Sequence, residues 1–397
     1  MYRISTRTMA DQTISSMLEQ QARMSKTQLQ LATGKRIVTP SDDPTGAVRV
    51  VDLKSSIGRV EQYQANADRA SARLEQEESV LFSVTNLLQR VQVLGVQGNN
   101  TGVYSAEETQ AMADEIRLLV DELEGLANTR DSNGDYIFSG YKSGTKPFTR
   151  TASDTYTYSG DQGQRQLQIS ADRTIADGDN GFDLFMDVDT GPWATVTGVA
   201  ATSFAAIADG DLTINGISVG GIPAAADATE RASQIVDAIN AISDSTNVSA
   251  ELATGSTVTL SSSDGDIDIV AASTAATGLT TATTAATTGT RNIFETLLQM
   301  ASTLESNGQV DRYLNDLTEA MDNISEVHSL VGARLNAVDE QNEVNADIKL
   351  VLEEHLSDVE DLDYTEAISR FNQQTVALQA AQQAYVKVQE LSLFNYI

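Results

Sequence analysis

Only two histidines, His328 and His355, could serve as imidazole bases or ligands. They are 27 residues apart, on the order of 40 Å along one helix, so they cannot share a site within a subunit. His328 falls on an apolar helical stripe, where we expect a packed or register-setting histidine. The sequence has no cysteine, which excludes disulfides, thiol nucleophiles and thiolate ligands.

The sequence lacks the His-Glu-x-x-His pair of zinc peptidases. We also expect no nucleophile elbow or catalytic triad of the serine-hydrolase kind. Thr33-Gly34-Lys35 lacks the glycine loop of a phosphate site and indicates a helix end. We therefore predict no catalytic residue, no cofactor and no enzymatic activity.

Two aspartate clusters, Asp177 to Asp183 and Asp264 to Asp268, could offer oxygen ligands to calcium. In the first, Val188 stands where a calcium loop needs its acidic twelfth residue, and Gly181 occupies a ligand position. Asp-Gly pairs are ordinary turn formers. We expect turns and no metal site, with ion binding by these turns left open.

The charge distribution limits the partners. The 397 residues, enough for roughly two to four domains, carry a net charge of −30. Residues 151–290 hold 3 basic and 18 acidic side chains, whereas residues 1–40 hold 6 and 2. Nucleic-acid binding needs clustered cations, so we expect no nucleic-acid partner. Apolar runs are short and no apolar signal segment opens the chain, so we expect no membrane insertion and no cleaved secretory signal.

Apolar residues recur at steps of three, four or seven near both ends of the chain, which predicts helices that pack on each other or on other subunits. We expect terminal helices over 1–40 and 365–397 that form an assembly layer. The candidate interface residues are Ile14, Met17, Met24, Leu31, Ile368, Phe371, Leu378, Tyr385, Leu391 and Phe394.

Longer helices follow inward from both ends. Asp43-Pro44 predicts a helix start, with a helix to about residue 97, and Ser105 with Glu108 predicts a capping box that opens another. From Val310 to Val359 a stripe repeats in steps of three and four, interrupted by Asn342, Asn345 and Lys349, as in a coiled coil. These segments predict a helical rod domain over 41–144 and 291–364.

The middle of the chain differs from both ends in amino-acid composition and in pattern. Residues 145–290 are rich in Thr, Ala, Gly, Ser and Asp, with alternating stretches typical of strands, an Asn-Gly hairpin signal at 215–216 and one amphipathic helix over 226–242. The stretch 271–290, nearly all Ala, Thr and Gly, predicts a linker or a weakly ordered segment. The fold class is therefore mainly α, a coiled-coil-like rod built from both termini, with an inserted β-rich α+β module.

Several motifs resemble the flagellin superfamily. The N-terminal signature is Gly34 to Ile37 followed by Pro40-Ser-Asp-Asp-Pro44, and Gly134 to Gly140 with Pro147-Phe148 resembles the point where that family leaves its helical rod. Thr213 to Gly216 and Ile235 to Asn240 resemble the IN motif. The ending Leu391 to Ile397 is more similar to the members at the hook–filament junction than to filament subunits.

The resemblance implies a structural role. Terminal helices would form an inner tube layer, the rod would surround it, and the module would face outward. The chain would be a secreted, extracellular part of the bacterial flagellum, exported by the type III route, at the junction of hook and filament. Its partners would be a neighbouring hook-associated protein, flagellin, an export chaperone and further copies of itself in a ring.

Two other functions stay open. Filament flagellin is an alternative of the same class, and a secreted adhesin with a helical stalk is an alternative of another class. An adhesin should carry a membrane anchor or a secretion signal, and neither is recognisable.

Overall fold

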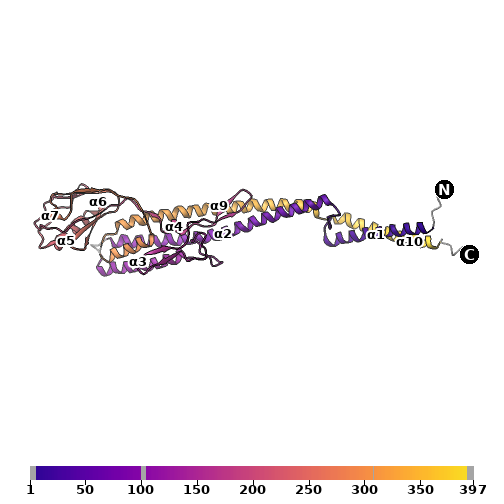
Figure 1. Cartoon of the computed structure of the whole chain (residues 1–397), viewed down its shortest axis with the longest axis horizontal. Coiled ribbons are helices and arrows are strands. Elements are labelled where there is room, and N and C mark those ends of the chain that lie inside the picture. The colour runs from indigo at the N-terminus through magenta and orange to yellow at the C-terminus, as the bar shows by residue number, and fades with distance from the viewer. Residues whose placement is uncertain (1–5, 100–103, 307, 391–397) are drawn as a thin grey trace. The chain divides into compact units, whose positions relative to one another are not determined.

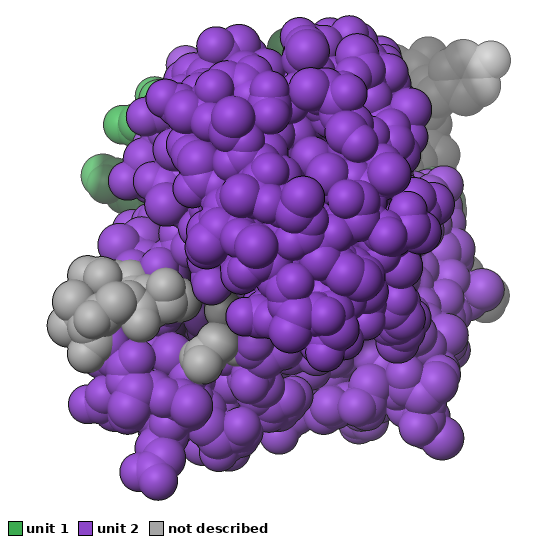
Figure 2. Space-filling view, turned by 90° about the vertical axis from the view of Figure 1, so that its left-hand side faces the viewer, with its two compact units in different colours: residues 1–65, 341–397 green, residues 66–340 purple. Residues whose placement is uncertain are grey.

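The computed structural model describes residues 6–99, 104–306 and 308–390 (Figure 1). It divides into unit 1, residues 1–65 with 341–397, and unit 2, residues 66–340 (Figure 2). Across the described part of the chain, every helix is too short or too polar to span a bilayer.

Six helices account for most of the helical residues. They are α1 (Thr6–Thr33), α2 (Pro44–Gly98), α3 (Ala106–Ala127), α8 (Ile293–Glu305), α9 (Asp311–Glu360) and α10 (Tyr364–Glu390). The other helices in the described residues are α4 (Gly181–Phe185), α5 (Ala228–Asn240), α6 (Ser243–Thr246) and α7 (Thr274–Thr277).

In unit 1, α1 and α10 pack against each other. Gly34, at a φ of +71°, ends α1 in the left-handed conformation that favours glycine. The Asp43 carboxylate accepts a hydrogen bond from the Gly46 N–H at 2.9 Å and so caps the start of α2. The predicted helix end and the predicted cap are both confirmed.

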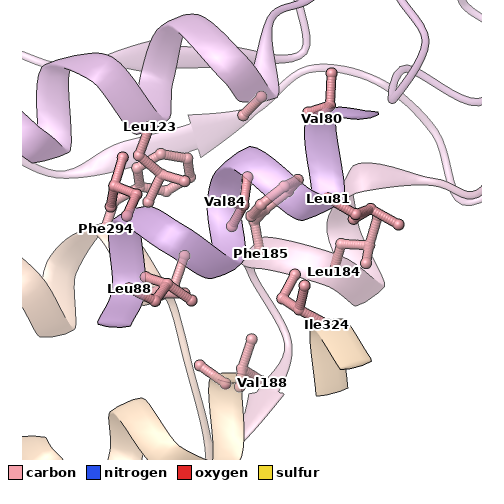
Figure 3. Close-up of a cluster of buried hydrophobic side chains, with 14 of the residues drawn as sticks. Val80, Leu81, Val84, Leu88, Leu123, Leu184, Phe185, Val188, Phe294 and Ile324 are labelled. Atoms are coloured by element: carbon pink, nitrogen blue, oxygen red, sulfur yellow. The ribbon is translucent and has the colours of Figure 1, made fainter. Parts of the chain in front are cut away.

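The first core of unit 2 lies between α2, α3, α8 and α9. Figure 3 shows Val84 and Leu88 of α2 among Leu123, Phe185 and Phe294. Around it lie two hairpins, β1 (Phe148–Arg150) with β2 (Tyr156–Tyr158) and β3 (Gln166–Gln168) with β4 (Thr174–Ala176).

An aromatic cluster binds the first hairpin to the helices. The Phe148 ring centroid lies 5.4 Å from that of Phe294 and 5.5 Å from that of Phe185, and Tyr156 stacks on Phe294 at 4.3 Å. Residues 148–188, expected in the inserted module, therefore contribute to the helical core because their aromatic side chains are buried in it.

A second core lies wholly within residues 194–279. One sheet has the order β6-β10-β9 and another β12-β11-β7-β8, all antiparallel, with α5 packed on β9 and β10. The strands are β6 (Thr195–Thr197), β7 (Leu212–Ile214), β8 (Ile217–Ser218), β9 (Val248–Ala253), β10 (Thr257–Ser262), β11 (Ile267–Ala271) and β12 (Ala282–Thr284).

Two expectations for the module are settled by this fold. The Asn-Gly hairpin is confirmed, because Asn215 and Gly216 both have positive φ between β7 and β8. The linker expected over 271–290 is wrong: α7 and β12 lie within it, and β12 pairs with β11. Its weakly apolar residues are ordered by main-chain pairing.

Candidate assembly surface

Six of the ten candidate interface residues are half-buried on the two helices that pack together in unit 1. Met17, Met24 and Leu31 on α1 are half-buried where α1 packs on α10. Phe371, Leu378 and Tyr385 on α10 are half-buried in the same way. The Thr375 hydroxyl donates to the Met24 sulfur at 3.9 Å. We call these six residues the seam, and it joins the two terminal helices of one chain.

Two other candidates, Ile14 and Ile368, lie outside the seam. Ile14 and Ile368 are 37% and 50% exposed. Leu391 and Phe394 lie outside the described residues. The six seam residues are spaced by seven on each helix, whereas Ile14 and Ile368 are joined to them by steps of three, which also fit a neighbouring stripe.

Each terminal helix carries further apolar residues that the sequence reasoning missed. Leu18 is 60% exposed and Leu29 is 49% exposed on α1, and Val376 and Val386 are 64% and 54% exposed on α10. At 3.6 residues per turn, Leu18 and Leu29 lie about 100° to 120° around α1 from Met17. We call Ile14, Leu18, Leu29, Ile368, Val376 and Val386 the outer stripe. In the sequence, the outer stripe could have been found from the apolar residues that recur out of phase with the spacing of the seam.

The same unit exposes apolar residues on its other helical segments. They are Val48 and Val51 on α2, and Val344, Ile348, Leu350 and Val351 on α9. Scattered exposed aliphatics are normal, but so many on one unit are typical of a surface that is covered by a partner.

A cluster of charges fixes the loop that follows α1. Lys35 and Lys54 both reach the Glu360 carboxylate, at 2.7 and 2.8 Å. The Leu362 N–H donates to the Gly34 carbonyl at 3.0 Å, and the Arg36 N–H donates to the main-chain carbonyl of Glu360 at 2.7 Å. Burial raises the pKa of Glu360, but the bonds from the two lysines outweigh it and leave the pKa below its ordinary value. The start of α10 is thus anchored where α1 ends.

A second charged cluster is buried in unit 2. Arg73 pairs with Asp131 at 3.2 Å and Arg334 with Asp179 at 2.7 Å. Between them the Glu77 carboxylate accepts a hydrogen bond from the Asp179 N–H at 3.1 Å, while its other oxygen has no hydrogen-bond partner. Burial, with the nearby charge of Asp179, raises the pKa of Glu77 to about 8. This cluster ties α2 and α9 to the loop before α4.

The residues considered for chemistry have structural partners. The His328 side chain is 37% exposed and lies 3.7 Å from the Glu78 carboxylate, so it is partly packed, and a register-setting role for it stays a prediction. His355 is exposed. Asp177 is ion-paired with Arg165, and Asp266 accepts a hydrogen bond from the Ala286 N–H.

Family models match the chain in three places. The bacterial flagellin N-terminal helical region matches residues 4–143, and the flagellin C-terminal helical region matches residues 314–397. The flagellin hook IN motif matches residues 211–264. The two terminal models together cover more than half of the chain.

Individual relatives agree. Flagellar hook-associated protein 3 of Escherichia coli K12 is 27% identical over 394 residues, 99% of each chain. The Salmonella typhimurium protein of the same name is 35% identical over 186 residues, 47% of this chain and 57% of its own. A flagellin of Bacillus subtilis is 32% identical over 111 residues, 28% of this chain and 36% of its own.

A solved structure has the same fold. The flagellar hook-associated protein 3 of Legionella pneumophila superposes with a TM-score of 0.56 at 23% identity, over 77% of this chain and 98% of its own. Because both terminal models and the full-length relative agree, the chain belongs to the flagellin superfamily, in its branch of flagellar hook-associated protein 3.

Proposed function

We propose that the chain is a structural adaptor at the junction of flagellar hook and filament, onto which filament subunits assemble. The observation that carries the proposal is the pair of terminal helices. Their seam joins them within one chain, yet the outer stripe leaves large aliphatic side chains in water. Covering such side chains releases free energy of about 25 cal/mol per Å² of apolar surface, which suits assembly with neighbouring subunits.

The relatives support a junction role over a filament role. The match to a hook-associated protein 3 spans 99% of both chains, whereas the match to flagellin spans 36% of that protein. Filament flagellin is nevertheless the second candidate, because the terminal helical models are those of flagellins. The two candidates predict different locations, because a flagellin would be present along the whole filament and a junction protein only where the hook meets the filament.

The partners follow from this role. A ring of copies would contact a neighbouring hook-associated protein on one side and flagellin on the other. The ten candidate residues, within 1–40 and 365–397, would form its inner layer, with 41–144 and 291–364 around it and 145–290 outward. An adaptor with these contacts needs no catalytic site.

Export is the other part of the proposal. We place the chain outside the cell, delivered by the flagellar type III channel with an export chaperone. The basic balance of residues 1–40, with 6 cations against 2 acids, supports an address in this segment. Deleting residues 2–20 should keep the protein in the cytoplasm; normal external levels of this truncation would refute the address.

Deletion of the gene tests the adaptor role. In the bacterium that carries it, the deletion should leave hooks intact and release flagellin monomers into the medium, because filament subunits have nothing to assemble on. Re-expression of the chain should restore filaments. Filaments of normal length on the deletion strain would reject the proposal.

A further inference from the structure

The two cores of unit 2 are joined by a narrow two-stranded ribbon. Its strands are 188–193 and 287–291, and they contain β5 (Val188–Asp189) and β13 (Thr290–Arg291), which pair in antiparallel fashion. The ribbon ends where the N–H groups of Trp193 and Thr287 each donate to the carbonyl of the other, at 3.3 and 2.9 Å. Within the described residues the two cores share no buried member. A thin ribbon between two separate cores is a natural hinge.

Beside the ribbon, the module and the helical core face each other across a crevice of about 430 Å³. Asp244 and Asp264 line it from the module, and Asp311 lines it from the first turn of α9. Burial raises the pKa of Asp311, and the charge of Asp244 adds to the effect. Asn315 donates a side-chain hydrogen bond across the crevice to the Ser263 carbonyl. Carboxylates that face each other across a gap repel, and this repulsion offsets the hydrogen bond from Asn315 to Ser263, so this side of the interface holds the module only weakly.

The contact that can hold it is made by Trp193. The Arg312 guanidinium of α9 lies 3.6 Å from the centroid of the Trp193 ring, and the Arg291 guanidinium lies 5.5 Å from it. Arg291 in turn pairs with the buried Asp316 carboxylate of α9 at 3.3 Å. The Arg312 Nε–H is buried and has no hydrogen-bond partner. The Arg312 guanidinium also lies 5.6 Å from the centroid of the Tyr313 ring, so the Trp193 ring is the nearer of its two aromatic contacts.

We propose that Trp193 clamps the hinge: its stacking on Arg312, backed by Arg291, sets the orientation of module 194–287 on the helical core, and loss of this stacking lets the module swing on the ribbon while both cores stay folded. The orientation of the outward module is then decided by one side-chain contact. This inference concerns the isolated chain and does not depend on the proposed function.

Spin labels test the clamp in the full-length chain. Because the chain has no cysteine, Ser233→Cys on α5 and Glu319→Cys on α9 would carry the labels, and both positions are exposed. Double electron–electron resonance should give one narrow distribution of the distance between the two labels in the chain that is otherwise unchanged. Arg312→Gln should broaden it severalfold. As the matched control, Arg173→Gln changes an exposed arginine on the β3–β4 turn and should keep it narrow.

Fluorescence gives a second readout, because Trp193 is the only tryptophan. In Arg312→Gln its emission should shift to longer wavelength and its quenching by acrylamide should rise. Cleavage in the ribbon by a protease should become about tenfold faster, the ratio that corresponds to about 1.4 kcal/mol of lost contact. The circular dichroism spectrum should not change. Unchanged distances in Arg312→Gln, or loss of strand signal in that variant, would overturn the clamp.

Discussion

The Tyr364 hydroxyl lies 2.8 Å from the point that a β-carbon on Gly34 would occupy. This close approach brings the last turn of α1 against the first residue of α10. Because Gly34 also has a φ of +71°, a side chain there meets both a steric contact and a strained backbone. The packing of the two terminal helices thus begins at a position that only glycine fills without strain.

We predict that Gly34→Ala destabilises unit 1 by about 1–2 kcal/mol, the usual range for a non-glycine residue forced into the left-handed region. Thermal unfolding followed by circular dichroism measures the change. Gly58→Ala is the control, since Gly58 lies inside α2 with no atom within 4 Å of its β-carbon position. That substitution should stabilise by about 0.5–1 kcal/mol. An equal effect of the two variants would contradict the role given to Gly34.

We predict that Glu77 gives the free energy of unfolding an unusual dependence on pH. Its pKa, raised by burial to about 8, means that the folded chain holds a proton there which the unfolded chain releases near pH 4.5. The stability contributed by the protonated Glu77 is therefore full below about pH 4.5 and is lost as pH rises towards 8, by on the order of 5 kcal/mol. Glu77→Gln mimics the protonated form and should flatten the fall.

Denaturant unfolding between pH 5 and 9 measures this slope. Glu75→Gln is the matched control, because Glu75 lies two residues away on α2 and is exposed. It should keep the slope of the unchanged chain. A Glu77→Gln variant with that same slope would show that Glu77 is ionised in the fold.

The aromatic cluster should dominate the first core. Phe294 contacts Phe148, Tyr156 and Phe185, and none of its surface is exposed. Phe294→Ala should cost about 3–5 kcal/mol, from lost burial and from the cavity that remains. Phe82→Ala, at a phenylalanine that is 60% exposed on α2, should cost under about 1 kcal/mol. Calorimetry of both variants checks the contrast.

Sequence periodicity predicted the helices well because their stripes are long. It grouped the seam residues, which are spaced by seven, as an assembly interface, and that interface stays a prediction. It misplaced the hairpin at 148–158, since no local pattern tells that Phe148 and Tyr156 are buried against α8, more than a hundred residues later. Leu18, Leu29, Val376 and Val386 of the outer stripe were missed for a related reason. Periodicity identifies the face of a helix that is buried, and it says nothing of a second face that only a partner covers.

The seam and the outer stripe predict different phenotypes. Leu378→Asp places a charge between α1 and α10 and should separate them, so proteolysis of the purified chain should trim both termini faster. Leu18→Asp should leave that trimming unchanged, yet prevent filament attachment in cells. Gln379→Asp, at an exposed position beside Leu378, should be mild in both assays. Normal filaments on the Leu18→Asp strain would remove the outer stripe from the interface.

The most direct measurement of the central claim is the position of the chain on the flagellum. Gold-labelled antibody against module 194–287, viewed by electron microscopy on intact cells, locates the module without altering the chain. The account predicts label in a narrow band where the hook meets the filament, and none further along. Label along the whole filament would identify a filament subunit and contradict the junction role.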